Sequence, residues 1–177
     1  MTINLKDTIR TIPNFPKEGI MYRDITTLLT NRAALAEAVR RLCDPYRDKC
    51  IDNVAGIEAR GFTFGAAMAV ELGAGFVPIR KKGKLPFDVY SEDYELEYGT
   101  DTIEIHADSI RREEKVLLVD DLIATGGTAE AGVKLLRKTG CEIVGAAFVI
   151  DLPDLGGLKR ITDMGIPVTA LVAFEGH

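Results

Sequence analysis

The sequence VLLVDDLIATGGT, from Val116 to Thr128, decides the fold. Its first four residues are apolar and mostly branched, as expected for a buried strand of a parallel sheet. Asp120 and Asp121 follow at the carboxyl end of this strand, which is where open α/β sheets bind their ligands. The pattern therefore predicts a ligand site at a sheet edge that carries two carboxylates.

A short loop of small residues follows the aspartates: Ala124, Thr125, Gly126, Gly127 and Thr128. Because glycine leaves the backbone unhindered, several N–H groups can converge on one anion where the next helix begins. The threonine hydroxyls add further donors. Carboxylates accept hydrogen bonds from sugar hydroxyls but repel phosphate. We therefore predict a sugar phosphate, with its phosphate in the loop and its sugar over the aspartates.

Other motifs fit this stretch less well. A nucleoside-triphosphate P-loop needs lysine after its second glycine, whereas Thr128 follows Gly127. A dinucleotide fingerprint needs three spaced glycines, and the loop has two adjacent ones. In a phosphoacceptor signalling domain the acidic pair follows the first strand, and here it comes too late in the chain. A strand end with an acidic cap and a glycine turn stays open as an alternative.

Strand and helix patterns alternate along the rest of the chain. Asn31 can cap a helix whose apolar face is formed by Leu35, Ala38, Val39 and Leu42. Strands are predicted at 53–57, 76–79, 116–119, 143–150 and 168–172, and further helices at 61–72 and about 128–138. This order indicates a single α/β domain with a central, mostly parallel sheet flanked by helices.

Residues 81–101 interrupt this alternation and are too many for an ordinary connection. Four aromatic residues and the alternating pattern TIEIH that follows favour a partly ordered flap, and disorder is the alternative. A basic cluster lies where the segment begins, formed by Arg80, Lys81, Lys82 and Lys84. It is either a solvated surface or a site for an anion such as pyrophosphate.

Composition narrows the function classes. The 177 residues are 46% hydrophobic and 28% charged, which suits one globular domain, and a net charge of −5 argues against a nucleic-acid partner. No apolar run reaches membrane-span length and residues 1–12 lack a secretory core, so we expect a cytoplasmic protein without a membrane partner. Three cysteines and two histidines without metal-ligand spacing predict neither a structural metal site nor a disulfide framework.

Four stretches together resemble one family. VLLVDDLIATGGT is similar to the phosphoribosyl pyrophosphate motif of the type I phosphoribosyltransferases, and its form is closest to the adenine phosphoribosyltransferases. IPNFPKEGIMYRDIT (12–26) resembles the N-terminal signature of that family, GIEARGF (56–62) its pyrophosphate loop, and LEYG (96–99) its catalytic lid. The resemblance covers nearly the whole chain. It implies one domain over residues 1–177, with a hood from about 1–30 and 151–177 and a flexible flap at 81–101.

The resemblance also implies roles for individual residues. The implied catalytic residues are Glu97, Arg60, Asp120 and Asp121, and the implied 5′-phosphate site is formed by Ala124, Thr125, Gly126, Gly127 and Thr128. Pyrophosphate would be bound by Ala59, Arg60, Lys81 and Lys84. Adenine would be bound by Met21, Tyr22, Arg23 and Leu152. Tyr22 stands where the family often has phenylalanine, and Tyr98 would help to close the flap. A cis peptide is expected between Ala59 and Arg60. Mg²⁺ would be held mainly by substrate and water, and the protein would be a homodimer.

The implied activity is the conversion of adenine and phosphoribosyl pyrophosphate to AMP and pyrophosphate in purine salvage. One alternative is a 6-oxopurine, xanthine or orotate transferase, against which the N-terminal signature argues. The other is a regulator of the same fold that senses phosphoribosyl pyrophosphate without catalysis. Such regulators typically carry a DNA-binding unit or a basic face, and this acidic chain keeps the flap glutamate that a sensor would not need.

Overall fold

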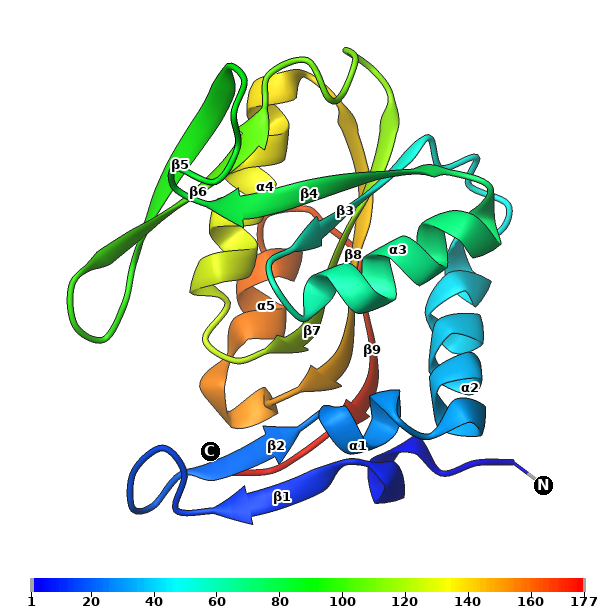
Figure 1. Cartoon of the computed structure of the whole chain (residues 1–177), viewed down its shortest axis with the longest axis vertical. Coiled ribbons are helices and arrows are strands. Elements are labelled where there is room, and N and C mark those ends of the chain that lie inside the picture. The colour runs from blue at the N-terminus through cyan, green and yellow to red at the C-terminus, as the bar shows by residue number, and fades with distance from the viewer. Residues whose placement is uncertain (1, 177) are drawn as a thin grey trace.

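A seven-stranded sheet forms the centre of the molecule (Figure 1). The computed structural model describes residues 2–176. The strand order is β5-β6-β4-β3-β7-β8-β9. Five neighbouring strands are parallel: β4 (Gly75–Lys81), β3 (Asn53–Ile57), β7 (Lys115–Ile123), β8 (Glu142–Asp151) and β9 (Val168–Ala173). Strands β5 (Val89–Glu95) and β6 (Thr100–His106) extend the sheet in antiparallel fashion. The predicted mostly parallel α/β sheet is confirmed.

Helices cover both faces of the parallel strands. Helices α2 (Arg32–Cys43) and α3 (Gly61–Leu72) share one hydrophobic core with Leu117 and Val119 of β7. Helices α4 (Gly127–Thr139) and α5 (Gly157–Thr162) share a second core with Val116 and Leu118. Successive side chains of a strand point to opposite faces, so a strand covered on both sides is apolar throughout. This explains the unbroken run VLLV.

Most element bounds follow the local sequence pattern. The side chain of Asn31 accepts a hydrogen bond from the Ala34 backbone N–H at 3.1 Å and so caps α2 as predicted. Strand β7 differs, because it continues four residues beyond the predicted end at Val119 and includes both aspartates. The reason is its long neighbour β8, since the ladder between them runs on to the pair Ile123 and Asp151.

The N-terminal residues lie beyond the carboxyl ends of β7, β8 and β9 (Figure 1). The 3-10 helix η1 (Leu5–Thr8) precedes a hairpin of β1 (Arg10–Pro13) and β2 (Met21–Asp24), and α1 (Thr26–Leu29) follows. The C-terminal residues run beside this hairpin, where an Arg23 guanidinium N–H donates to the carbonyl of Glu175. Short 3-10 turns η2 (Asp44–Tyr46) and η3 (Pro153–Leu155) complete the chain.

The segment that interrupts the strand and helix pattern is an antiparallel hairpin. Strands β5 and β6 pair from Val89 with His106 to Glu95 with Thr100, and residues 96–99 form the tip. Tyr94 is buried beneath it against the core of α4. The hairpin extends away from the body of the molecule, as Figure 1 shows at the left. No helix within residues 2–176 is long and apolar enough to cross a membrane.

Candidate active site

A cavity of about 500 Å³ opens at the carboxyl ends of β3 and β7. It is lined by residues from the ends of these strands, the loops after them, and the start of α4: Ile57, Glu58, Ala59, Arg60, Lys81, Tyr94, Asp120, Asp121, Leu122, Ile123, Ala124, Thr125, Gly126, Gly127, Thr128 and Ala129. Ten of the predicted site residues are therefore brought together here. The predicted residues that do not line the cavity are Met21, Tyr22, Arg23, Lys84, Glu97, Tyr98 and Leu152.

The glycine loop is shaped by its contact with the start of α5. Gly126 has φ +86°, and a Cβ built on it would lie 2.9 Å from the Cα of Gly157. The Gly157 N–H donates to the carbonyl of Ala124 at 3.0 Å, which holds the two loops together. Within residues 2–176, the N–H groups of residues 125–129 donate to no other protein group. They can bind an anion at the N-terminus of α4.

The two aspartates have different surroundings. Asp121 is buried, and its Oδ2 lies 2.8 Å from Nε of Arg60, whereas Asp120 accepts the backbone N–H of Asp121 at 2.8 Å. Burial and the neighbouring Asp121 charge raise the pKa of Asp120 well above its usual range. Asp120 therefore needs hydrogen-bond donors or a cation from a ligand to be stable as an anion.

Arg60 connects two parts of the site, strand β7 and strand β2. It is the N-cap residue of α3, and its side chain also reaches β2, where NH1 donates to the Tyr22 hydroxyl at 2.5 Å. Burial lowers the pKa of Arg60, but the neighbouring Asp121, Tyr22 and Asp120 together outweigh burial, and the pKa is raised. The guanidinium therefore stays charged. It is tied to β7 and β2 at the same time.

The expected position of the cis peptide was wrong by one residue. The bond lies between Glu58 and Ala59, and the bond between Ala59 and Arg60 is not cis. Neither peptide contains proline, so the sequence carries no signal that distinguishes one from its neighbour.

Glu58 organises the basic cluster, and sequence reasoning missed it. Its carboxylate pairs with Arg80 and Lys84 and accepts the backbone N–H of Lys81. Burial raises the pKa of Glu58, but these contacts outweigh it and hold the pKa below its usual range. Its place inside the quoted GIEARGF stretch, next to Arg60, was the available signal. An acid there can hold the lysines in position.

Lys81 and Lys84 are therefore ion-paired in this structure. Lys84 pairs with Glu58, and Lys81 pairs with Asp101 of β6 and lies 2.6 Å from the Tyr94 hydroxyl. Burial lowers the pKa of Lys81, but hydrogen bonds to Asp101 and Tyr94 raise it by more. Of the two lysines, Lys81 lines the cavity and Lys84 does not.

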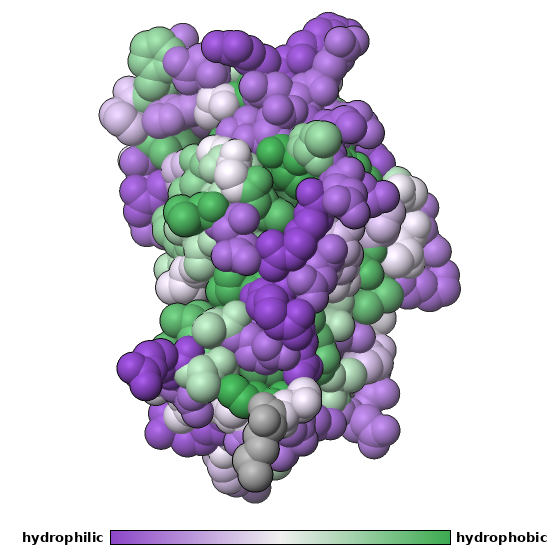
Figure 2. Space-filling view, turned by 90° about the vertical axis from the view of Figure 1, so that its right-hand side faces the viewer, coloured by the Kyte–Doolittle hydropathy of each residue, from purple (hydrophilic) through white to green (hydrophobic). Residues whose placement is uncertain are grey.

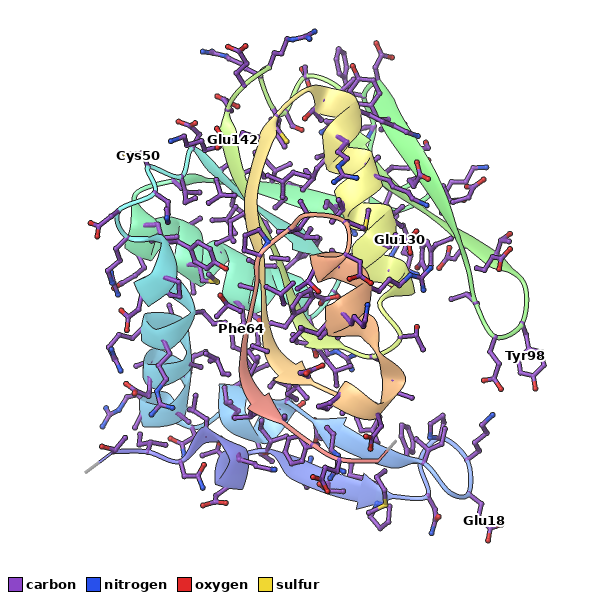
Figure 3. The ribbon with its side chains drawn as sticks, turned by 180° about the vertical axis from the view of Figure 1, so that it is seen from behind. Glu18, Cys50, Phe64, Tyr98, Glu130 and Glu142 are labelled. Carbon is purple, nitrogen blue, oxygen red and sulfur yellow. The ribbon has the colours of Figure 1, made fainter. Side chains whose placement is uncertain are left out.

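The residues of the hairpin tip lie outside the cavity. The Glu97 side chain is 70% exposed, and its Oε1 lies 3.5 Å from Nζ of Lys17 in the β1–β2 loop. Tyr98 is 84% exposed and points away from the body at the tip (Figure 3). Their roles in the reaction stay predictions.

The residues expected to bind the base are arranged around β2. Met21 is exposed, and Tyr22 meets Phe15 edge-on with ring centroids 5.1 Å apart. Arg23 donates to the Thr11 hydroxyl at 2.6 Å and packs its guanidinium on Phe174, so its side chain is already engaged. Leu152 is 8% exposed and belongs to the core. Among these four, Tyr22 reaches a cavity residue through Arg60.

The described residues do not form a metal site by themselves. Within residues 2–176, no group of three or more histidine, cysteine, aspartate or glutamate side chains is placed to hold an ion.

These features define a class of protein. A cavity at the carboxyl edge of a parallel sheet that sets an acidic pair against an anion-binding loop is suited to phosphoribosyl transfer. In agreement, the model of the phosphoribosyl transferase domain family matches residues 24–170.

Relatives and solved structures narrow the class further. Adenine phosphoribosyltransferases from Maricaulis maris and Mesorhizobium japonicum are 58% and 59% identical to the chain, covering 98% and 100% of it and 99% and 100% of their own lengths. The crystal structure of the enzyme from Rhodothermus marinus superimposes with a TM-score of 0.90 at 49% identity, with 96% of each chain covered. The chain belongs to the adenine phosphoribosyltransferase family.

Proposed function

We propose that the chain transfers the phosphoribosyl group of phosphoribosyl pyrophosphate to adenine, forming AMP and pyrophosphate. The observation that carries this proposal is that the N–H groups of the loop and two carboxylates line the same cavity. The ligands of related structures fit the same reaction. The Saccharomyces cerevisiae enzyme is complexed with an imino-altritol bisphosphate and adenine, and that of Trypanosoma brucei with AMP, pyrophosphate and ribose-5-phosphate.

The sugar phosphate is anchored at two places. The loop Ala124–Thr128 binds the 5′-phosphate through its backbone N–H groups and threonine hydroxyls, far from the bond that breaks. Asp120 and Asp121 accept hydrogen bonds from the ribose hydroxyls. Their negative charge also stabilises the positive charge that develops on the ribose as the anomeric C–O bond breaks. Remote binding energy thus positions the reacting carbon.

Cationic side chains stabilise the departing pyrophosphate. Arg60 offers a guanidinium edge that can grip two oxygens, and the backbone near Ala59 lines the same part of the cavity. Lys81 and Lys84 are held close by Asp101 and Glu58 and turn toward the pyrophosphate when it binds. As negative charge moves onto the leaving group, these interactions strengthen.

Mg²⁺ is the proposed cofactor. The observation that fits it is a pair of carboxylates on the cavity wall, Asp120 and Asp121, of which Asp120 accepts the backbone N–H of Asp121. Oxygen is the ligand that Mg²⁺ prefers, and one or two carboxylates with substrate oxygens and water suffice. When bound, the ion would neutralise the pyrophosphate oxygens and make them a better leaving group.

Adenine is read by the backbone of β2 and stacked between side chains. The Tyr22 ring packs on one face and Leu152 on the other, while backbone groups near Met21 and Arg23 meet the ring edge. The Arg23 guanidinium contacts Thr11 and Phe174, so we assign recognition of the base to the main chain of this segment. A 6-oxopurine presents the reverse donor and acceptor pattern, which leaves buried polar groups unpaired at a cost of ~1 to 3 kcal/mol each.

Glu97 acts after the hairpin folds over the bound substrates, with Tyr98 closing the cover. In the open arrangement its side chain is 70% exposed and is not part of the cavity lining. Exclusion of water strengthens charge interactions, so a carboxylate near the junction of ribose and purine can take the purine proton or stabilise the cationic ribose.

One assay tests the activity. Purified protein is incubated with phosphoribosyl pyrophosphate and Mg²⁺ together with adenine, hypoxanthine, guanine or orotate, and products are separated by chromatography. We expect AMP and pyrophosphate from adenine, with a specificity constant larger by orders of magnitude than for the other bases. The reaction should stop when EDTA removes Mg²⁺. Comparable rates with hypoxanthine would assign the chain to the 6-oxopurine transferases instead.

We also propose a homodimer in which α3 contributes to the contact. The outer side of this helix carries two exposed apolar residues, Ala66 and Val70, and Val70 is 84% exposed. Exposed apolar residues that lie together on a surface are typical of protein–protein contacts. Figure 2 shows hydrophobic patches between hydrophilic residues on this side of the molecule. Light scattering should give twice the mass of one chain, and the measured mass of Val70→Glu should fall toward that of a single chain.

A cytoplasmic location completes the proposal. Cys50 is exposed and free, and Cys43 and Cys141 are free as well. Reduced thiols are typical of a reducing compartment. Fractionation of cells that express the tagged protein should recover it with cytoplasmic markers.

A further inference from the structure

We propose that Tyr22 is a positioning residue that acts through its hydroxyl group, by holding Arg60 in the orientation that binds the phosphoribosyl donor. This inference rests on the proposed function. It gives Tyr22 a second task beside stacking on adenine, and the task depends on the one atom by which tyrosine differs from phenylalanine.

The first observation is the pair of anchors on the guanidinium. Arg60 Nε lies 2.8 Å from Asp121 Oδ2, and NH1 donates to the Tyr22 hydroxyl at 2.5 Å. The guanidinium is planar and its N–H groups form a rigid fork, so two anchors on different nitrogens fix both its position and its tilt. With Asp121 alone, the group could rotate about a single contact.

The second observation is where the anchors come from. Asp121 belongs to β7 in the buried sheet, whereas Tyr22 belongs to β2 in the N-terminal hairpin, and the two strands are in different sheets. Among the hydrogen bonds and ion pairs of the described residues, the bond to Tyr22 is the one that ties Arg60 to that hairpin. The part of the site that receives the base and the part that receives the sugar phosphate are thus linked through one guanidinium.

The third observation is that the guanidinium has capacity left for a ligand. Its NH2 group and one N–H of NH1 are not used by Asp121 or Tyr22, and the side chain is 50% exposed at the cavity. The free edge can therefore meet phosphate oxygens while the other positions are held. A correctly tilted edge binds two oxygens, and a misplaced one binds fewer.

The test is Tyr22→Phe, which keeps the ring and removes the hydroxyl. We expect the KM for adenine to stay within about twofold of wild type, because stacking survives. The KM for phosphoribosyl pyrophosphate should rise, or kcat fall, so that kcat/KM for this donor drops by about tenfold, the size of one hydrogen bond to a charged group. Calorimetric affinity for the donor in the absence of adenine should fall by a similar factor.

Two further variants separate positioning from general damage. Tyr90→Phe removes a hydroxyl from the outer hairpin, formed by β5 and β6, and should leave all these kinetic and binding constants unchanged. In an Arg60→Lys background, Tyr22→Phe should have almost no further effect, because the hydroxyl acts through the guanidinium. An equal loss in both backgrounds, or wild-type donor binding in Tyr22→Phe, would overturn the inference. A wild-type protein without activity on adenine would instead disprove the proposed function.

Discussion

The loop of residues 124–128 and the outer hairpin, formed by β5 and β6, both contribute to the cavity lining, and they differ in how they are held. The loop follows a strand whose residues 116–119 are fully buried, and it rests on the backbone of Gly157. The tip of the hairpin has no such support. Its Glu97 forms an ion pair with Lys17 in which both side chains are more than half exposed. A site that must bind tightly and also admit two substrates needs one element that is held firmly and one that is held weakly. In the proposed reaction, the fixed loop would position the sugar phosphate and the hairpin would cover the bound substrates.

The largest expected effect concerns the loop of residues 124–128. A Cβ on Gly127 would have its nearest protein neighbour at 3.8 Å, so the fold tolerates it, but the residue lines the cavity where we propose that the phosphate binds. Gly127→Val should lower the affinity for AMP and phosphoribosyl pyrophosphate by more than about 100-fold in calorimetry. The melting temperature should stay within a few degrees of wild type.

Gly126→Val is the matched contrast. Its Cβ would meet the Gly157 backbone at 2.9 Å, and its φ of +86° disfavours any L side chain by roughly 1 to 2 kcal/mol. This variant should lose stability first, as seen in thermal unfolding. Unchanged ligand affinity in Gly127→Val would remove the loop from the binding account.

The second effect concerns the cover. Glu97→Gln should slow the chemical step about 100-fold in single-turnover experiments with saturating substrates, if the glutamate acts in the closed state. Glu95→Gln, two residues earlier on the same hairpin, should stay near wild type. Equal and nearly normal rates in both variants would leave the hairpin as a simple cover, with catalysis resting on the aspartates and Arg60.

The third effect is on stability and depends on pH. The pKa of Asp120 is raised in the folded protein, so the folded state holds this proton more tightly than the unfolded state does. As pH rises above the unfolded pKa of ~3.9 and through the folded one, Asp120 therefore costs stability. Asp120→Asn cannot ionise, so it should melt a few degrees above wild type near pH 8, with a smaller difference near pH 5.

Asp121→Asn is the control for this measurement. Its carboxylate pairs with Arg60, so its loss leaves that charge unpaired and should not raise the melting temperature. Both variants should lose activity. A difference between Asp120→Asn and wild type that is the same at pH 5 and pH 8 would contradict the assigned titration.

The sequence predicts what is fixed locally. Strand β3 and helix α3 have the predicted bounds, because their apolar patterns and flanking residues are enough to define them. The Ala124–Thr128 loop was recognisable because glycines, threonines and a preceding strand are contiguous in the chain. All of its residues line the cavity.

What the sequence does not predict depends on residues far apart in the chain. The end of β7 is set by its pairing with β8, some 28 residues later. The contacts of Arg60 with Tyr22, 38 residues away, and of Glu58 with Lys84, 26 residues away, arise only when the strand ends converge. Apolar residues carry even less signal, so Leu152 could not be assigned to the core or to the base from its type alone.

The smallest expected effect tests the contact between the β1–β2 loop and the tip of the β5–β6 hairpin. Lys17 and Glu97 lie 3.5 Å apart with both side chains more than half exposed, and water and salt screen such pairs. Lys17→Ala should therefore change kcat by less than about threefold, even though its partner is the predicted catalytic residue. The change should shrink further in 0.5 M KCl. A loss near the 100-fold expected for Glu97→Gln would mean that Lys17 helps to place the carboxylate in the closed state, and the hairpin would then be guided by the β1–β2 loop rather than by the substrates alone.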